Sequence, residues 1–491
     1  MVHLMNNNSI KAKVLSSLFW KLMEQGGSQG IQFIVQIVLA RLLLPEDFGL
    51  IAIVTIFILL ANVFVQSGFN TALIQKKDAD DEDFSSVFYL SLFVAGLLYV
   101  VLFLTSPFIS VFYRSPQLIL ILRVLSVTLF FGAFNSIQNA YVARNMMFKK
   151  LFFSSLGAII ISGTVGIATA YLGWGVWALV AQQLTNQLAV TLILWFTVKW
   201  RPKLLFSIEK VKVLFSFGWK LLASSLINTL YMEIRSLIIG KIYIPAMLGF
   251  YDRGQQIPKV IVSNIDGAIQ SVMLPALASQ QDDKKRVKAM MRRAIMTSSF
   301  IMFPMMVGLA VVAEPVVKII LTDKWLPAVP FLQIFCASYS LWPIHTANLQ
   351  AINALGRSDI FLKLEIIKKV IGIIILGVSI PFGIYAIAWG VLISGVISTF
   401  INAYPNLKLL NYSYIEQWKD IMPSLGISLV MGAVVYTLNF LNIAVWQILM
   451  LQVFVGVVIY IGLAKVFKVE SFGYLVKTTR EIIEGRKKVY A

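Results

Sequence analysis

The sequence is poor in the residue types that most metal and catalytic sites require. Among its 491 residues are one cysteine, Cys336, and two histidines, His3 and His345. A single cysteine has no intrachain disulfide partner, and these counts exclude Cys-rich and His-based metal clusters. The sequence also has no G-x-x-x-x-G-K-[ST] motif, which excludes ATP hydrolysis of the P-loop kind. We expect no metal and no cofactor. Transport coupled to H+ or Na+ stays open.

Charged residues are also scarce, at 13% of the chain, whereas 58% of residues are hydrophobic and the mean hydropathy is +0.81. This composition is far from that of soluble domains and predicts an integral membrane protein. A net charge of +19 would also suit a protein that binds nucleic acid. The basic residues here lie between apolar stretches and form no separate basic domain, so membrane topology explains them better and we expect no nucleic-acid partner.

The apolar stretches are long enough for helices that cross a bilayer, which needs about 20 residues per span. We therefore predict an all-α integral membrane fold with about 14 transmembrane helices. The predicted spans lie near residues 15–42, 48–75, 84–112, 117–143, 151–172, 175–198, 212–243, 246–279, 288–321, 327–354, 358–380, 383–403, 421–440 and 443–466.

The loops between these spans alternate in charge. Loops after even-numbered spans are rich in Lys and Arg, as in KKRVKAMMRR at residues 284–293, and so is the tail after residue 466. Odd-numbered turns such as LPEDFG, YRSPQ and LGWG are short and poor in cations. By the positive-inside rule, both termini and the even loops are predicted to be cytoplasmic.

The first span carries a polar stripe that recurs about 200 residues later, as in transporters built from parallel repeats. Its members follow helical spacing: Lys21, Gln25, Gln29, Gln32 and Gln36. The second copy is Lys220, Ser224, Asn228, Tyr231 and Arg235, and Arg41-x3-Pro45-x3-Gly49 likewise returns as Lys241-x3-Pro245-x3-Gly249. We predict an N-terminal lobe at 1–203, a C-terminal lobe at 204–410, and two further helices with a basic tail at 411–491.

Further polar residues lie on the neighbouring spans. Asn62 and Gln66 lie on one face of the second span, and Asp266 lies in the eighth. Ionisable groups at membrane depth are costly and usually face a bundle interior or a wet cavity. The stripes therefore predict a hydrated central cavity between two six-helix lobes, and Glu24, Glu233 and Asp266 are candidates for ion coupling.

Structural explanations compete with these roles. Amides also join membrane helices to one another, and Lys21 and Lys220 lie close enough to the cytoplasmic ends of their helices to reach lipid headgroups. Glu233 could neutralise Arg235, and we favour an ion pair of Glu24 with Lys21 over a coupling role.

The sequence resembles a known family in three stretches: FWKLMEQGGSQGIQFIVQIVLARLLLPEDFGLIAIV near the N-terminus, LGFYDRGQQIP at 248–258 and LQAINALGRSD at 349–359. They are similar to the polysaccharide flippases of the multidrug/oligosaccharidyl-lipid/polysaccharide (MOP) exporter superfamily, and most of all to its colanic-acid-type and lipopolysaccharide O-unit exporters. The resemblance covers nearly the whole chain. It implies a transporter, not an enzyme, in the bacterial cytoplasmic (inner) membrane.

The resemblance also implies the cargo, an undecaprenyl-pyrophosphate-linked oligosaccharide moved from the cytoplasmic to the periplasmic leaflet by alternating access. Cations suit the pyrophosphate, whereas amides suit sugar hydroxyls. Predicted pyrophosphate contacts are Arg235, Lys220, Lys21 and Arg123. The predicted lining of the sugar path is Gln25, Gln29, Gln32, Gln36, Asn62, Gln66 and Asn228. Expected partners are the lipid-linked oligosaccharide, membrane lipids and other polysaccharide-assembly proteins, and we expect a monomer.

Two other functions compete with a flippase. An ion-coupled multidrug antiporter of the same superfamily would need acidic residues in the cavity, whereas here cations outnumber carboxylates at membrane depth. A membrane-embedded polysaccharide polymerase or ligase would need a large outer loop, and the predicted outer turns are short. The acidic run DADDED at 78–83 has the spacing of some glycosyltransferase metal sites, but at the start of a span it is better explained as a helix cap.

Overall fold

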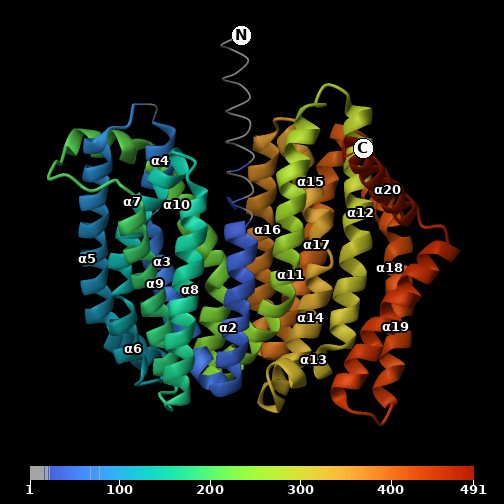
Figure 1. Ribbon diagram of the computed structural model, residues 1–491, viewed down its shortest axis with the longest axis horizontal. Coiled ribbons are helices and arrows are strands. Elements are labelled where there is room, and N and C mark those ends of the chain that lie inside the picture. Colours follow the sequence, from blue (N-terminus) through green and yellow to red (C-terminus); the bar gives the residue numbers. More distant parts are fainter. Residues whose placement is uncertain (1–15, 17–19, 22, 67, 77, 491) are drawn as a thin grey trace. The chain divides into compact units, whose positions relative to one another are not determined.

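The computed structural model describes residues 16, 20–21, 23–66, 68–76 and 78–490. Their regular secondary structure is helical, as the sequence predicts (Figure 1). The chain divides into two compact units, residues 1–252 and 253–491. The predicted lobe boundaries at residues 203 and 410 stay predictions, as does the cavity between lobes.

The first unit contains ten helical elements and the start of an eleventh among the described residues. They are η1 (Met23–Gly27), α2 (Ser28–Leu42), α3 (Pro45–Gln66), α4 (Phe69–Gln75), α5 (Asp81–Tyr113), α6 (Leu118–Leu125), α7 (Thr128–Arg144), α8 (Phe148–Tyr171), α9 (Val176–Thr197), α10 (Ile208–Ile242) and the beginning of α11 (Pro245–Ala278). Local signals set several of these ends. Pro45 and Pro245 each occupy the first position of a helix, where proline loses no hydrogen bond.

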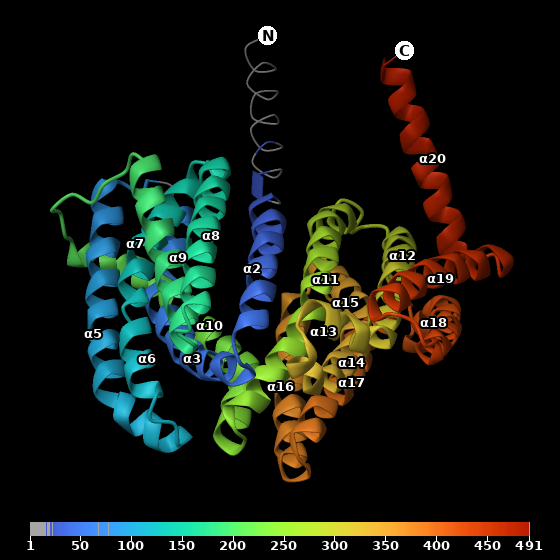
Figure 2. The ribbon, with the colours of Figure 1, turned by 60° about the horizontal axis from the view of Figure 1, so that its bottom comes forward.

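The second unit begins within α11. The helices that follow are α12 (Lys284–Val311), α13 (Ala313–Ile320), η2 (Asp323–Ala328), α14 (Val329–Tyr339), α15 (Trp342–Ala354), α16 (Ser358–Ser379), η3 (Ile380–Phe382), α17 (Ile384–Leu410), α18 (Tyr414–Thr437), η4 (Leu438–Phe440), α19 (Val445–Val466) and α20 (Glu470–Tyr490). Figure 2 shows α18, α19 and α20 grouped at one edge of this unit. Tyr460 of α19 fixes this group to α12 by donating to the carbonyl of Phe300.

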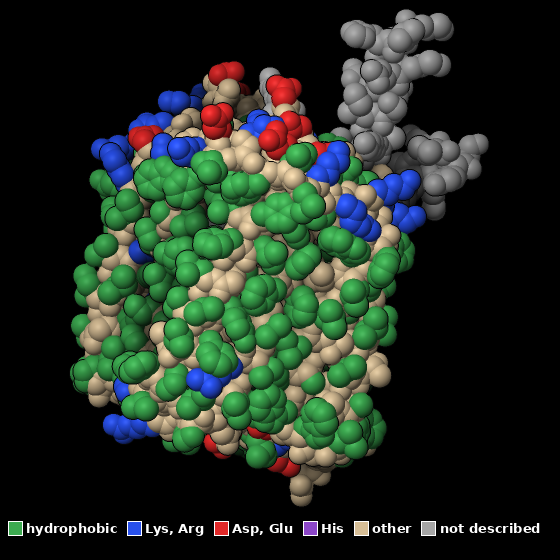
Figure 3. Space-filling model, turned by 90° about the vertical axis from the view of Figure 1, so that its left-hand side faces the viewer, with side chains coloured by type: hydrophobic (Ala, Val, Ile, Leu, Met, Phe, Trp, Pro, Cys, Tyr) green, Lys and Arg blue, Asp and Glu red, His purple; other side chains and the backbone are tan. Residues whose placement is uncertain are grey.

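The prediction of a multi-pass helical membrane protein is confirmed, whereas the count of fourteen spans is not. By length and composition, ten described helices can cross a membrane, or eleven if the bent α10 is included. The remaining predicted spans fall on elements that are short, such as α2, α14 and α15, or charged, such as α16 with Glu365, Lys368 and Lys369. Figure 3 shows one face of the molecule, where a nearly continuous hydrophobic band lies between charged residues at its upper and lower edges.

Two predicted spans are broken near their middle. The span at 117–143 divides into α6 and α7 around Ser126 and Val127, and the span at 327–354 divides at Ser340 and Leu341. In each unit, a broken helix places half-helix ends at membrane depth. Backbone hydrogen bonds continue across both breaks, as from the Val127 amide to the Val124 carbonyl and from the Leu341 amide to the Ser338 carbonyl.

The repeated Pro-x3-Gly motifs lie against each other in the first unit. A Cβ atom on Gly49 would overlap the carbonyl oxygen of Pro245, and one on Gly249 would overlap that of Pro45. The first turns of α3 and α11 therefore cross with their backbones in contact, which only small residues permit. A second close approach joins Gly68 to Gly218, where α10 bends by 54°.

Candidate functional site

A cavity of about 320 Å³, lined by both polar and apolar side chains, lies within the first unit. It is lined by Lys21 and by residues of η1, α4, α7, α8 and α9. The lining residues are Lys21, Glu24, Asn70, Ile74, Asn139, Ala140, Ala143, Phe148, Leu151, Ser154, Ser155, Val190 and Leu194. They come from the ends of these helices that adjoin the predicted cytoplasmic loops.

Glu24 reaches the cavity from η1, a π-helical turn with the sequence MEQGG, and Lys21 precedes this turn in the chain. Such turns are rare, occur mostly within α-helices, and are frequent at functional sites. The Lys21 ammonium lies 2.8 Å from Glu24 Oε2 and 5.8 Å from the centre of the Phe148 ring. Glu24 thus forms the ion pair that the sequence analysis favoured.

The remaining polar groups of the cavity are amides and hydroxyls. Asn70 Oδ1 accepts a hydrogen bond of 2.7 Å from Ser136, which leaves the NH2 group of Asn70 available as a donor. Ser154 is 1% exposed and its hydroxyl has no hydrogen-bond partner among the described residues. An unpartnered buried hydroxyl beside a cavity is a position where a bound ligand or water completes the hydrogen bonding.

The rest of the first stripe lies along α2. Gln29 is exposed, whereas Gln32 and Gln36 are half-buried. The side chain of Gln25 lies outside the described residues, although its backbone belongs to η1. The side chains of Gln29, Gln32 and Gln36 do not line the cavity of the first unit, and the predicted place of the four glutamines on a sugar path stays a prediction.

On α3, Asn62 and Gln66 form a polar pair. Gln66 Nε2 lies 3.4 Å from Asn62 Oδ1. A Cβ atom on Gly132 of α7 would lie 2.6 Å from that same oxygen, so the glycine makes room for the asparagine. Both side chains are half-buried. This packing fits amides that join helix α3 to α7, and it also fits the predicted lining of the sugar path.

The second stripe lies on α10. Lys220 and Asn228 are exposed, and Arg235 is half-buried, with its guanidinium 5.6 Å from the centre of the Tyr231 ring. Glu233, the proposed partner of Arg235, is also half-buried. Lys220 and Arg235 do not line the cavity around Lys21.

Arg123 is engaged in packing between two helices. It lies in α6 and donates from Nε to Ser106 Oγ of α5 at 2.9 Å. Its guanidinium also stacks on the Phe103 ring at 4.0 Å. The predicted pyrophosphate role of Arg123 is untested, and these contacts favour a role in holding α6 against α5.

Asp266, in the second unit, is a buried carboxylate with three donors. It accepts from Gln270 at 2.6 Å, from Trp342 Nε1 at 3.0 Å and from the Thr346 hydroxyl. Trp342 and Thr346 lie in the first turns of the half-helix α15, where the backbone dipole favours a negative charge. These three hydrogen bonds explain why a carboxylate is stable when buried at this position. The predicted role of Asp266 in ion coupling stays a prediction.

Several ionisable groups at membrane depth were missed by the sequence reasoning. Lys259 is exposed midway along α11, Glu365 and Lys368 form an ion pair in α16, and Arg253 is buried with a hydrogen bond to Gln256. Opposite charges three residues apart inside the apolar run 360–379 were the available signal for the α16 pair. The sequence analysis includes both charges in the predicted span at 358–380, because most other residues of the run are apolar.

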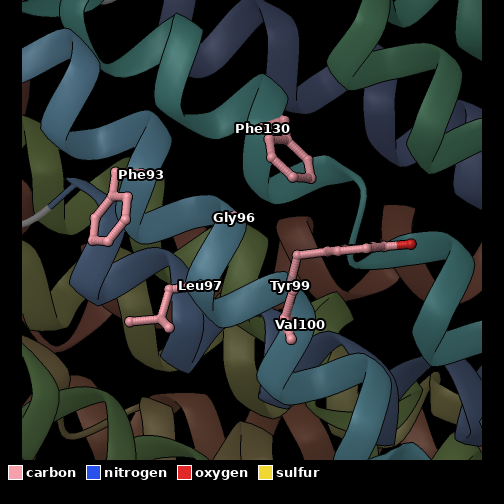
Figure 4. A pocket seen from close by; sticks show the side chains of 6 residues that line it. All are labelled: Phe93, Gly96, Leu97, Tyr99, Val100 and Phe130. Atoms are coloured by element: carbon pink, nitrogen blue, oxygen red, sulfur yellow. The ribbon is translucent and has the colours of Figure 1, made fainter.

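A second pocket, of about 420 Å³, has a different character. Figure 4 shows its lining, Phe93, Gly96, Leu97, Tyr99 and Val100 of α5 with Phe130 of α7. Phe93 is 70% exposed, and the Tyr99 hydroxyl is the one side-chain polar group among these residues. A surface of this kind suits lipid chains and offers no site for a charged or sugar ligand.

The acidic run at 78–83 acts as a helix cap, as expected. Asp80 and Asp83 form a reciprocal capping box at the start of α5. Lys210 at the start of α10 binds Asp80 and Glu82 at 2.6 and 2.7 Å. The hydrogen bond from Lys210 lowers the pKa of Asp80 from 3.8 to about 2.

The chain matches a model of a protein family. Residues 38–330, more than half of the chain, match the family model described as polysaccharide biosynthesis protein. Among curated relatives, the lipopolysaccharide biosynthesis protein WzxC of Escherichia coli is 26% identical over 87% of this chain and 89% of the relative. The teichuronic acid biosynthesis protein TuaB of Bacillus subtilis is 25% identical over 77% and 78%.

Solved structures show the same fold. The lipid II flippase MurJ in an inward closed conformation aligns with a TM-score of 0.73 over 92% of this chain and 98% of its own, at 15% identity. An inward-facing multidrug resistance MATE family transporter of the MOP superfamily aligns with a TM-score of 0.59 over 77% and 94%, at 16% identity.

Proposed function

Because the chain belongs to the polysaccharide biosynthesis protein family, we propose that it is a flippase that moves a lipid-linked oligosaccharide across the membrane. The proposed cargo is an undecaprenyl-pyrophosphate-linked repeat unit, moved from the cytoplasmic to the periplasmic leaflet by alternating access. The observation that carries this proposal is the cavity within a helical membrane unit, where Lys21 and a few further polar groups lie among apolar side chains.

The chemistry of the cavity fits the headgroup of such a cargo. A pyrophosphate leaving water needs cations or donors to replace its hydration, and a sugar needs amides and hydroxyls. Lys21 supplies a cation, and Asn70, Asn139 and Ser154 supply donors. The hydrophobic band on the outer face is compatible with a polyprenyl chain that stays in the bilayer (Figure 3).

The cations of α10 extend the proposed site. Lys220 is exposed and Arg235 is half-buried, so both are open to a ligand that travels along this helix. We propose that they contact the pyrophosphate at other stages of transport. The amides Gln29, Gln32, Gln36, Asn62, Gln66 and Asn228, with Gln25 next to Glu24, are the proposed lining of the sugar path.

The alternative functions have weaker support. A cation antiporter needs uncompensated carboxylates, whereas Glu24 is paired with Lys21 and Asp266 accepts three hydrogen bonds. The MATE likeness concerns the fold and names no substrate for this chain. A polymerase or ligase needs catalytic groups on an outer loop, and the described turns between helices are short.

We further propose a location in the bacterial cytoplasmic membrane with both termini in the cytoplasm. The basic loops support this orientation by the positive-inside rule. A monomer is the proposed functional unit, and other polysaccharide-assembly proteins of the membrane are its proposed partners.

The proposal is tested by leaflet translocation in proteoliposomes. A fluorescent undecaprenyl-pyrophosphate oligosaccharide is the probe, and wild type is compared with Lys21→Ala, Lys220→Ala and Arg235→Ala. Lys477→Ala is the control, because that lysine is 78% exposed on α20. We expect wild type and control to translocate the probe, and the three cavity and stripe variants to lose about tenfold or more in rate.

The outcomes distinguish an error in the proposed contact residues from an error in the proposed function. Equal rates in all variants would keep the flippase and discard these contacts. No translocation of any lipid-linked glycan by wild type, together with drug export, would replace the flippase with the antiporter.

A further inference from the structure

In the second unit, α11 presents polar side chains on an exposed face. Ser263, Asn264 and Gln270 are exposed there, although the helix is long and apolar enough to cross the bilayer. Ser263 and Gln270 are seven residues apart, which places them on one side of the helix. Polar groups at membrane depth are costly against lipid and usually face a bundle interior or a wet cavity. This face of α11 is therefore accessible to water and to a polar ligand.

Trp342, the first residue of α15, lies beside this face in a fixed orientation. Its Nε1 donates to the Asp266 carboxylate of α11 at 3.0 Å, and the Tyr339 ring packs on it edge to face, with ring centres 5.4 Å apart. Met273 of α11 and Ile344 of α15 belong to one hydrophobic core, so the two helices pack side by side (Figure 2). The indole nevertheless stays 36% exposed. It is a rigid aromatic surface that a ligand can reach.

A chain of amides continues from Asp266 along the same two helices. Gln270 Nε2 donates to the carboxylate at 2.6 Å, and Gln350 Nε2 lies 3.4 Å from Gln270 Oε1. Gln350 Oε1 is buried without a hydrogen-bond partner among the described residues, so a bound hydroxyl or water can complete its bonding. An amide NH2 has two donors, and the exposed Gln270 can therefore still donate to a ligand. We call these residues the α11/α15 patch: Ser263, Asn264, Asp266, Gln270, Trp342 and Gln350.

The α11/α15 patch contains one charged group, Asp266, and its carboxylate is already engaged. It is 8% exposed and accepts from Gln270, Trp342 and Thr346, so its part is to position the indole and the amide. The nearest described cation of α11, Lys259, precedes Gln270 by eleven residues, about 16 Å along the helix. A phosphate group needs cations, which the patch does not offer. The patch suits an uncharged polar ligand.

A pyranose sugar has the two kinds of surface that match this patch, a face of C–H groups and a rim of hydroxyls. The face packs on an aromatic ring, and the hydroxyls bond to amides and to other hydroxyls. We propose that the α11/α15 patch is a sugar subsite, with one pyranose ring of the oligosaccharide stacked on Trp342 and hydrogen-bonded to Gln270. Asp266 is the positioning residue of this subsite. The inference rests on the proposed function and assigns part of the glycan to the second unit.

The subsite and the cavity around Lys21 belong to different units and differ in chemistry. Lys21 offers a charge to the pyrophosphate, whereas the α11/α15 patch offers a ring and amides to the sugar. A change in the patch should therefore weaken the binding of the glycan and leave the binding of the lipid pyrophosphate intact.

The test compares two probes, both labelled on the lipid, with purified full-length protein in detergent. One is undecaprenyl pyrophosphate that carries a trisaccharide of neutral hexoses, and the other is the same lipid pyrophosphate without sugar. We expect wild type to bind the glycan probe more tightly. Trp342→Ala should lose about tenfold in affinity for the glycan probe, and Gln270→Ala about three- to tenfold, the effect of one hydrogen bond. Neither variant should change the affinity for the sugar-free probe.

Two further variants separate stacking from folding. Trp342→Phe keeps an aromatic ring without the N–H donor, so it should retain most of the preference for the glycan probe, and it replaces the alanine variant if that one does not accumulate. Trp389→Ala is the matched control, because Trp389 is a 51% exposed tryptophan of the second unit on α17, outside the patch. It should bind both probes as wild type does.

Three results would overturn the inference: wild type that binds the two probes equally, patch variants that bind the glycan probe as wild type does, or patch variants that lose both probes alike. Each of these leaves the leaflet assay unaffected, so the subsite can fail while the flippase stands. If the leaflet assay fails and the Trp342-dependent preference for the glycan probe persists, the subsite stands and the proposed cargo movement is wrong.

Discussion

At the scale of single residues, Arg123 shows how a cation at membrane depth can serve packing. Its Nε donor and its stacked guanidinium join α6 to α5. We expect Arg123→Ala to lower the free energy of unfolding by about 1–3 kcal/mol, because Ser106 loses the Arg123 donor, keeping only its own bond to the Phe103 carbonyl, and the ring contact is lost. Transport per folded molecule should stay unchanged. Thermal unfolding in detergent and the leaflet assay check both parts, and a transport defect at unchanged stability would return Arg123 to the headgroup site.

At Asp266, two substitutions distinguish the contribution of the negative charge from that of the hydrogen bonds. Asp266→Ala leaves the donors of Gln270, Trp342 and Thr346 unmatched in a buried site, which should cost about 2–4 kcal/mol of stability. Asp266→Asn keeps an acceptor oxygen and should cost less. Thermal unfolding of the two variants gives the comparison. If Asp266→Asn abolishes transport while its stability equals that of wild type, the carboxylate has a role beyond packing.

At the scale of helical elements, the crossing of α3 and α11 depends on two glycines. Gly249→Ala places a methyl group into the Pro45 carbonyl, and Gly49→Ala does the same at Pro245. Backbone cannot yield as a flexible side chain does, so we expect each variant to lose about 1–3 kcal/mol or to fail to accumulate. Gly267→Ala is the control in the same helix, because a methyl group there would meet no neighbouring segment within 4 Å. Equal stability of all three variants would show that the helices do not cross in contact.

The contact between the starts of α5 and α10 should respond to acid. Lys210 lowers the pKa of Asp80 to about 2, so the ionised carboxylate stabilises the fold above about pH 4, and this contribution is lost as the pH falls towards 2. Asp80→Asn still caps α5 but cannot form the ion pair. We therefore expect its thermal stability to fall less steeply than that of wild type between pH 4 and 2. Parallel curves for the two proteins would contradict this role.

At the scale of the whole molecule, the single buried cysteine makes topology measurable. Cys336→Ser gives a background without cysteine. Gln281→Cys and Asn442→Cys then place exposed thiols on a predicted cytoplasmic loop and a predicted periplasmic turn. With a membrane-impermeant maleimide on intact spheroplasts, we expect labelling of the second variant and protection of the first. The reverse pattern would invert the proposed orientation and, with it, the direction of transport.

The sequence alone was sufficient for the helical membrane fold. Hydrophobic runs and the placement of charge follow from the cost of polar groups in lipid, which acts on each segment separately. The ion pair of Lys21 with Glu24 was also predictable, because residues three apart face each other on any helix. The resemblance indicated the family that the comparison then showed.

Tertiary structure decided which of these polar residues share a site. Lys21 and Glu24 meet Asn70, Asn139 and Ser154 only because α4, α7, α8 and η1 pack around one space. Arg123, like Lys21, was predicted to contact the pyrophosphate, yet its side chain packs on Phe103 and donates to Ser106. Periodicity fixes the face of a helix on which a residue lies, whereas the group opposite that face depends on contacts between segments distant in the chain.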